Sequence, residues 1–126
     1  MTPPRPHRIL VVEDEVLVAE LLRDGLTEFG YVIAVAAGGA DALNKVSEDA
    51  PDLVLLDQHL PDMPGFEVLE RLRLRSSTVP VVIVSGNHDP MMAETARALG
   101  AVDYITKPVK LEVLSRAVAA ILRTRG

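Results

Sequence analysis

The chain has 126 residues, enough for one ordinary domain with a buried core, and its lack of cysteine excludes disulfides, thiolate metal sites and thiol redox chemistry. A formal net charge of −5 argues against direct binding of nucleic acid, because that affinity depends on lysine and arginine neutralising phosphates. No apolar stretch approaches the roughly 18 residues of a membrane span, and the N-terminus lacks the apolar core of a signal peptide, so we expect a cytoplasmic protein that does not enter the membrane.

Residues 1–7 contain three prolines and no periodic apolar pattern, and we interpret them as a flexible leader. A single domain is predicted over residues 8–126. Five short runs rich in β-branched residues predict strands at 8–12, 31–36, 52–57, 80–84 and 102–106.

Helical patterns fill the segments between these runs. In the first, Val18, Leu21, Leu22 and Phe29 are predicted to line one apolar face, and Gly30 ends the helix. The later helices are predicted over 39–48, after Gly65, from the Asp89-Pro90 cap to Gly100, and over 110–123. This fivefold alternation predicts an α/β fold with a parallel sheet covered by helices on both faces.

Polar residues stand where the apolar strand runs stop. Glu13 and Asp14 follow the first run, Asp57 ends the third, Ser85 follows the fourth and Lys107 follows the fifth. The carboxyl ends of parallel strands share one edge of a sheet, so we expect these side chains in one crevice. Acids that hold a hard cation, a nucleophilic carboxylate, a hydroxyl and a lysine are together the parts of a metal-assisted phosphoryl acceptor.

Four motifs resemble the receiver domain of two-component response regulators, and the resemblance extends from Arg8 to about Arg123. The motifs are residues 9–15 (ILVVEDE), 53–65 (LVLLDQHLPDMPG), 82–86 (VIVSG) and 103–108 (DYITKP). The resemblance implies a flavodoxin-like, doubly wound (βα)5 fold with strand order 2-1-3-4-5. It also implies a phosphoacceptor signalling domain that supports its own phosphorylation and slow self-dephosphorylation, and not an enzyme.

The acidic positions match the phosphoacceptor and metal residues of that family. Asp57 would accept the phosphoryl group of a phosphohistidine, Asp14 would hold Mg²⁺ or Mn²⁺ directly, and Glu13 would do so through water. Asp57 and the backbone carbonyl of His59 would complete the site. Without a cation, clustered acids raise one another's pKa. On the residues alone, Asp57 is also compatible with a cap for the following loop, and Asp14 with an acidic helix N-terminus.

The remaining matches concern the phosphoryl group and the switch. Ser85 matches a hydroxyl that binds it, Gly86 leaves the acceptor accessible, and Lys107 matches a compact charge for a phosphoryl oxygen. Pro108 implies a cis bond after Lys107. Tyr104 and Ser85 match a pair that changes the surface formed by the fourth helix, fifth strand and fifth helix. Taken singly, Ser85 is equally typical of a turn. A lysine before proline is more often solvated, and an aromatic residue on a strand is ordinary packing.

His59 and Asn87 lie two positions beyond active-site residues, and the resemblance implies that they tune self-dephosphorylation. The His59 side chain either shields the path of the attacking water or orients it, and we favour shielding. A transition-metal site that combines His59 with His88 is the less favoured alternative.

Other functional classes are compatible with parts of the pattern. A phosphatase of the haloacid-dehalogenase type also uses a nucleophilic aspartate and Mg²⁺, but its Asp-x-Asp is absent from Asp57-Gln58-His59. A flavodoxin-like cofactor binder would place a phosphate beside Glu13 and Asp14, which would repel it. A phosphate-independent interaction module is the third alternative.

The resemblance implies a histidine kinase or histidine phosphotransfer protein as partner, with an output domain or effector protein downstream. Val102 and Val109 depart from the Asp and Phe common in winged-helix DNA-binding regulators of this family, which argues against their characteristic dimer. We expect either a monomer or a phosphorylation-dependent dimer, and either a stand-alone receiver or one that belongs to a larger protein.

Overall fold

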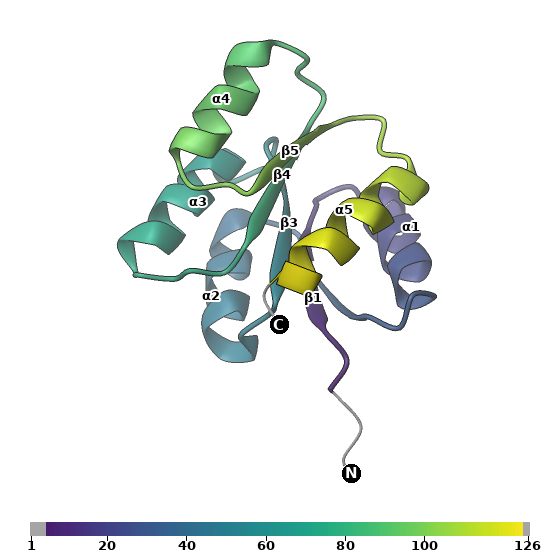
Figure 1. Cartoon of the computed structure of the whole chain (residues 1–126). Helices are drawn as coiled ribbons and strands as arrows, with labels where there is room; N and C mark the ends of the chain where they lie inside the picture. The colour runs from purple at the N-terminus through teal and green to yellow at the C-terminus, as the bar shows by residue number, and fades with distance from the viewer. Residues whose placement is uncertain (1–4, 125–126) are drawn as a thin grey trace.

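Residues 5–124, which the computed structural model describes, form five strands that alternate with five helices (Figure 1). The strands are β1 (Arg8–Val12), β2 (Val32–Ala36), β3 (Leu53–Asp57), β4 (Val81–Ser85) and β5 (Asp103–Thr106). The helices are α1 (Val16–Thr27), α2 (Gly39–Asp49), α3 (Gly65–Leu74), α4 (Pro90–Ala98) and α5 (Leu111–Thr124). The bounds of each strand agree with those predicted from its apolar run to within one residue.

The five strands form one parallel sheet in the order β2-β1-β3-β4-β5. This confirms the predicted flavodoxin-like, doubly wound α/β fold. The order reverses direction beside β1, where the chain first adds β2 on one side and then β3 on the other. In such sheets the ligand crevice lies at this reversal, outside the carboxyl ends of the strands.

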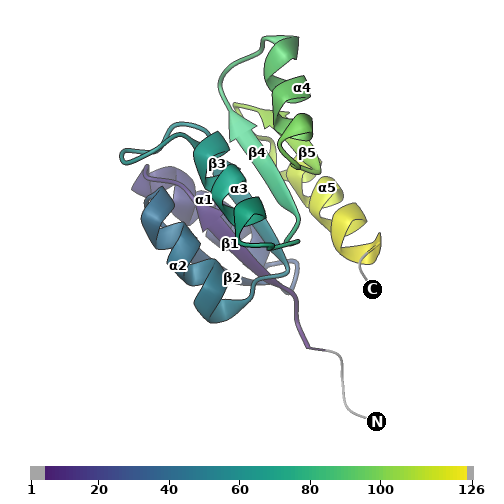
Figure 2. The same ribbon diagram turned by 90° about the vertical axis from the view of Figure 1, so that its left-hand side faces the viewer.

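Helices cover both faces of the sheet, because alternate residues of a strand point to opposite faces. Figures 1 and 2 show α2, α3 and α4 on one face and α1 and α5 on the other. On β1, Leu10 and Val12 pack with the first group of helices, and Ile9 and Val11 pack with the second. Each of these side chains is 1% exposed, and burial of one contributes roughly 1.5–3 kcal/mol. The sheet is therefore a well-packed layer that holds its edge residues in place.

The buried face of α1 differs from the one predicted. Leu21 is 70% exposed and Phe29 is 56% exposed, whereas Ala19, Gly25 and Leu26 are buried with Leu22. The reason is the close approach of α5: a Cβ at Gly25 would collide with the side chain of Leu111. The contact face of α1 therefore contains the small residues Ala19 and Gly25. The predicted face was wrong at Leu21 and Phe29, because the prediction considered only large apolar residues.

Several helix ends agree with their sequence signals. Asp89 caps α4 by accepting a hydrogen bond from the Met91 amide at 3.0 Å, and Pro90 is the first residue of the helix. Gly30 and Gly100 follow α1 and α4 with φ of 89° and 103°, the left-handed conformation that glycine adopts readily. None of the helices in residues 5–124 has the length and apolar character needed to cross a membrane.

The predicted flexible leader, residues 1–7, lies partly outside the described residues. Residues 5–7 have no regular secondary structure, but the carbonyl of His7 accepts a hydrogen bond from the amide of Val32 at 2.9 Å. The hydrogen bonding between β1 and β2 therefore begins one residue before β1, at His7.

Candidate functional site

The polar residues predicted to gather at the carboxyl edge of the sheet do lie there, because backbone hydrogen bonds continue the strand pairing past the strand ends. The amide of Glu13 donates to the carbonyl of Ala36 at 2.9 Å, and that of Lys107 donates to the carbonyl of Ser85 at 2.8 Å. Asp57 is itself the last residue of β3 and is paired with Val84 in β4. Pairing of β1 with β2, of β3 with β4 and of β5 with β4 thus fixes the backbone from which these side chains extend.

At the centre of the edge, Lys107 bridges two buried carboxylates. Its Nζ lies 3.1 Å from Oε1 of Glu13 and 3.1 Å from Oδ2 of Asp57. The two acidic side chains are 3% and 4% exposed, whereas that of Lys107 is 27% exposed. One ammonium group therefore forms ion pairs with two carboxylates that are almost fully shielded from solvent.

The pairing of two buried carboxylates with one lysine changes the pKa values of Glu13 and Lys107. Burial of Glu13, together with its hydrogen-bonding contact with Asp57, raises the pKa of Glu13 to about 7, and the bonds to Glu15 and Lys107 offset this only in part. Burial alone would lower the pKa of Lys107, but hydrogen bonds to Asp57 and Glu13 outweigh burial, so its pKa is raised. The lysine is therefore a fixed positive charge, and the acids still lack a full complement of cations.

The arrangement suits a divalent metal ion. Glu13, Asp14 and Asp57 each offer a carboxylate oxygen, and these oxygens all lie within 4.8 Å of one another. Asp14 is exposed, so the group opens to solvent on one side. Mg²⁺ prefers a few carboxylates together with several retained waters, and a cation of this kind would relieve the repulsion among the acids.

The loop after β3, residues 58–64, is shaped by close backbone contacts. The Gly65 amide donates to the carbonyl of Gln58 at 2.9 Å, and a Cβ at Gly65 would collide with the carbonyl oxygen of Asp57. The amide of His59 donates to Oδ1 of Asp57 at 3.2 Å, while its side chain is exposed. The backbone of residue 59 therefore lies beside the Asp57 carboxylate, and its role as a metal ligand stays a prediction.

Ser85 and Tyr104 meet at the backbone of Asn87. Oγ of Ser85 accepts a hydrogen bond from the Asn87 amide at 3.1 Å, and the hydroxyl of Tyr104 donates to the Asn87 carbonyl at 2.7 Å. Ser85 is buried and Tyr104 is half-buried. A Cβ at Gly86 would meet no atom within 4 Å, so the space beside Ser85 is open. The two residues of the expected switch pair are thus linked through one loop residue.

Two further expectations concern single residues. The peptide bond between Lys107 and Pro108 is cis, as the resemblance predicted. The side-chain oxygen of Asn87 accepts a hydrogen bond from the Asp89 amide at 2.9 Å, so this side chain is engaged with the loop that leads into α4. The roles of Asn87 and His59 in phosphoryl lifetime stay predictions.

The histidine alternative finds no support in the geometry. Among the described residues, the three acids are the group of three or more potential ligands whose atoms converge, and neither His59 nor His88 belongs to it. Both histidines are exposed.

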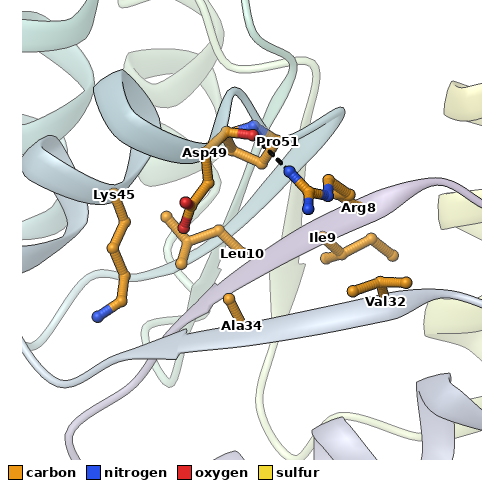
Figure 3. Close-up of a pocket in the computed structure, with 8 residues that line it drawn as sticks. All are labelled: Arg8, Ile9, Leu10, Val32, Ala34, Lys45, Asp49 and Pro51. Atoms are coloured by element: carbon orange, nitrogen blue, oxygen red, sulfur yellow. Dashed lines mark hydrogen bonds between the residues drawn. The ribbon is translucent and has the colours of Figure 1, made fainter.

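A separate cavity of about 130 Å³ lies at the opposite edge of the sheet (Figure 3). Arg8 and Val32, the first residues of β1 and β2, stand at this edge, and the Arg8 guanidinium donates to the carbonyl of Asp49 at 3.2 Å. The other lining residues are Ile9, Leu10, Ala34, Lys45 and Pro51. The converging acidic groups lie at the other end of the strands.

Two residues at the edge were not singled out from the sequence. Gln58 is buried, and its side-chain oxygen accepts a hydrogen bond from the amide of Phe66 in the first turn of α3 at 2.8 Å. Asp62 binds the first two amides of α2 at 2.8 and 2.9 Å. Their partners are backbone groups, which leave no side-chain signal in the sequence.

Comparison with known proteins places this geometry in a family. Residues 9–119 match the model of the response regulator receiver domain. The transcriptional regulatory protein KdpE of Mycobacterium tuberculosis is 42% identical over 116 residues, which cover 91% of this chain and 51% of KdpE. The transcriptional regulatory protein AfsQ1 of Streptomyces coelicolor is 36% identical over 115 residues, which cover 91% of this chain and 51% of AfsQ1. The chain spans about half the length of these curated relatives.

Solved structures agree over almost the whole chain. A receiver domain protein of the CheY-like type from Methanospirillum hungatei superposes with a TM-score of 0.88 at 30% identity, covering 95% of this chain and 96% of that one. The receiver domain of the Francisella response regulator 1452 superposes with a TM-score of 0.92 at 25% identity, covering 97% and 100%. The fold match and the family match thus both extend over most of the chain.

Proposed function

This chain belongs to the family of response regulator receiver domains of two-component signalling, and from that membership we propose that Asp57 accepts a phosphoryl group from a phosphohistidine donor. Members of the family are signalling phosphoacceptors and not catalytic enzymes, which decides against the phosphatase and flavodoxin-like alternatives. The observation that carries the proposal is the contact of buried Asp57 with Lys107 inside a group of three acids.

The proposed reaction transfers a phosphoryl group from a histidine side chain of the donor protein to the side chain of Asp57. A carboxylate oxygen of Asp57 attacks the phosphorus atom, the bond between phosphorus and the donor's histidine nitrogen breaks, and an acyl phosphate forms. The nitrogen regains its electron pair and the donor imidazole leaves. Lys107, already 3.1 Å from Oδ2 of Asp57, stabilises the negative phosphoryl oxygens, and Ser85 supplies a hydroxyl beside them.

The acids are suited to a divalent cation, and receiver domains bind Mg²⁺. In the proposed site, Asp14 and Asp57 would hold Mg²⁺ or Mn²⁺ directly, Glu13 through water, and residue 59 through its backbone carbonyl. The cation supplies charge neutralisation for the incoming phosphoryl group. The fit rests on the donor set, because hard carboxylate oxygens within 4.8 Å of one another are what such a cation prefers.

We propose that phosphorylation changes the surface formed by α4, β5 and α5. The support is the chain of contacts from Ser85 through Asn87 to Tyr104 in β5 and to the cap of α4. The Ser85 hydroxyl would donate to a phosphoryl oxygen, and its rotation toward the phosphoryl group would move Oγ away from the Asn87 amide. Loss of this bond would release the loop between β4 and α4, and small shifts of this kind are amplified where packed elements have two stable arrangements.

The family implies a histidine kinase partner, and the matched relatives are longer regulators. We propose that the donor is such a kinase or a histidine phosphotransfer protein, that the output lies in an attached domain or a separate effector, and that the domain acts in the cytoplasm. The replacements Val102 and Val109 favour a monomer or a phosphorylation-dependent dimer of a different kind from that of winged-helix regulators.

The test uses acetyl phosphate as a small phosphodonor. The protein is incubated with it and Mg²⁺, and phosphate incorporation is followed by intact mass with and without EDTA. The expected product carries one phosphate, forms only with the metal present and is removed by hydroxylamine, which cleaves acyl phosphates. Amide resonances of α4, β5 and α5 should shift with the same time course. Incorporation that EDTA leaves unchanged, or a phosphate that resists hydroxylamine, would contradict the proposal.

A further inference from the structure

We propose that Asp62 is a positioning residue for the cation site at Asp57. Its carboxylate ties the β3–α3 loop, residues 58–64, to the N-terminus of α2, and this tie sets the place of the His59 backbone carbonyl relative to the acidic group. The inference rests on the proposed function, because the carbonyl matters only where the acids hold a cation.

The tie uses both oxygens of the Asp62 carboxylate. The amide of Gly39 donates to Oδ1 at 2.8 Å, and the amide of Ala40 donates to Oδ2 at 2.9 Å. These amides begin α2, where the first four N–H groups of a helix lack partners within it and the helix dipole favours negative charge. The cap position of α2 is occupied by Gly38, which has no side chain to serve them. A residue from another loop therefore caps this helix.

The two glycines allow the loop to approach α2 this closely. A Cβ at Gly38 would lie 3.0 Å from Oδ1 of Asp62, and one at Gly39 would lie 2.5 Å from Cγ of Met63. The loop tip at Asp62 and Met63 is therefore packed directly on the start of α2. Contact through both a bidentate carboxylate and a neighbouring side chain makes the tie directional, in contrast to an ordinary surface ion pair.

Residue 59 needs such a tie because it is not part of a strand. Glu13 and Asp57 are held by pairing in the sheet, whereas residues 58–64 leave the sheet and return only at α3. The base of the loop is closed by the bonds of Gln58 with the amides of Gly65 and Phe66. Asp62 adds a second anchor on the far side of His59, so the loop is held at its base and at its tip.

The bonds of Asp62 to α2 also fix the position of the β3–α3 loop relative to Glu13 and Asp57. The amide of Glu13 donates to the carbonyl of Ala36, the last residue of β2, at 2.9 Å. Two residues separate Ala36 from the start of α2 at Gly39. The N-terminus of α2 therefore has a fixed position relative to the end of β1. Because Asp62 bonds to this N-terminus, the loop that contains His59 is fixed relative to β1 as well.

The test measures Mg²⁺ affinity by titration, with the amide shifts of residues 13, 14, 57 and 59 as readout. We expect the Kd for Mg²⁺ to rise about tenfold in Asp62→Ala, the size typical of residues that orient a metal's ligands, and by less in Asp62→Asn. Asp41→Asn is the matched control, because Asp41 lies in the first turn of α2 and is exposed but pairs with Lys45 in the same helix. Its Kd should stay within about twofold of wild type.

A further variant leaves every charge in place. Gly38 has φ −158° and ψ 173°, an extended conformation open to any residue. Gly38→Ala therefore adds only a methyl group 3.0 Å from Oδ1 of Asp62, so the carboxylate must shift slightly to make room. We expect this variant to weaken Mg²⁺ binding in the same direction as Asp62→Asn. At saturating Mg²⁺ the cation holds the loop itself, so the rate of phosphorylation by acetyl phosphate should return to the wild-type value in all these variants.

The outcomes separate this inference from the proposed function. An unchanged Kd in folded Asp62→Ala or Asp62→Asn would overturn the positioning role, and so would an equal loss in Asp41→Asn, which would show a general effect of charge or of α2 stability. Wild-type protein that binds no Mg²⁺ would instead contradict the proposed function itself.

Discussion

The ammonium nitrogen of Lys107 lies 3.1 Å from Oδ2 of Asp57, although 50 positions separate the two residues in the chain. The carboxylate is 4% exposed, so the bond forms where water screens charge poorly. Because parallel pairing fixes both backbones, the ammonium is already in place before any phosphoryl group arrives. Such preorganised charge contributes most to reactions in which negative charge moves.

Replacement of Lys107 should slow phosphorylation more than it weakens Mg²⁺ binding. We expect Lys107→Ala to lower the initial rate of phosphate incorporation by on the order of 10²-fold at saturating Mg²⁺, the cost typical of one lost electrostatic donor. Lys107→Arg should not restore the rate, because a planar guanidinium does not fit where a compact ammonium bridges two carboxylates. A wild-type rate in Lys107→Arg, measured by intact mass over time, would argue against the contact.

Removal of Asp14 should weaken the cation site directly. Asp14→Ala is expected to raise the Kd for Mg²⁺ by at least about tenfold, because it removes a ligand and not merely a distant charge. Asp24→Ala is the matched control, since Asp24 is a 79% exposed acid in the adjoining helix α1. If both variants bind Mg²⁺ as tightly as wild type, Asp14 is not a ligand.

The side chain of His59 should lengthen the lifetime of the phosphorylated state by shielding it. His59→Ala is expected to release phosphate faster than wild type. The backbone amide of His59 bonds to Asp57, and in this variant its exposed imidazole would no longer obstruct the approach of water. His88→Ala, an exposed histidine in the loop before α4, should leave the half-life unchanged. A half-life in His59→Ala that equals or exceeds that of wild type would defeat shielding. A strong pH dependence near the histidine pKa would favour orientation of the water.

Asp62 should also contribute to stability, independently of any metal. The amides of Ala40 and Gly39 lower the pKa of the Asp62 carboxyl below its usual value. A lowered pKa in the folded state stabilises the protein above the unfolded pKa, near pH 4, and this contribution is lost as the pH falls through the folded pKa.

We therefore expect Asp62→Ala to cost about 1 kcal/mol at pH 7 in the presence of EDTA, the usual value of a lost helix cap. The difference from wild type should shrink as the pH falls below about 4. Urea denaturation at several pH values measures both quantities. A difference that grows toward acid pH would contradict the assignment of Asp62 as an ionised cap.

Much of the central site could be predicted from sequence because its residues stand at strand ends. In a parallel sheet, a residue that terminates an apolar run must lie at the carboxyl edge, so Glu13, Asp57, Ser85 and Lys107 were bound to be neighbours once the order of the strands was known. The same logic brings Lys107 and Glu13 together, although they are 94 positions apart.

The parts that were missed depend on contacts that sequence patterns do not encode. Asp62 lies in a loop rich in turn-forming residues, and its partners are backbone amides 22 and 23 positions away. The contact face of α1 was misplaced for a related reason, since Gly25 is buried by the approach of Leu111 from α5 and not by its own hydrophobicity. Close backbone approach is a property of the assembled fold.

Asp57 is proposed as the single phosphoryl acceptor, and a comparison of wild type with Asp57→Asn tests this assignment. The substitution keeps the size of the side chain but removes the nucleophilic carboxylate. Both proteins are incubated with acetyl phosphate and Mg²⁺, and their intact masses are recorded. We expect one added phosphate on wild type and none on Asp57→Asn. An Asp57→Asn protein that still gains one phosphate would contradict this assignment.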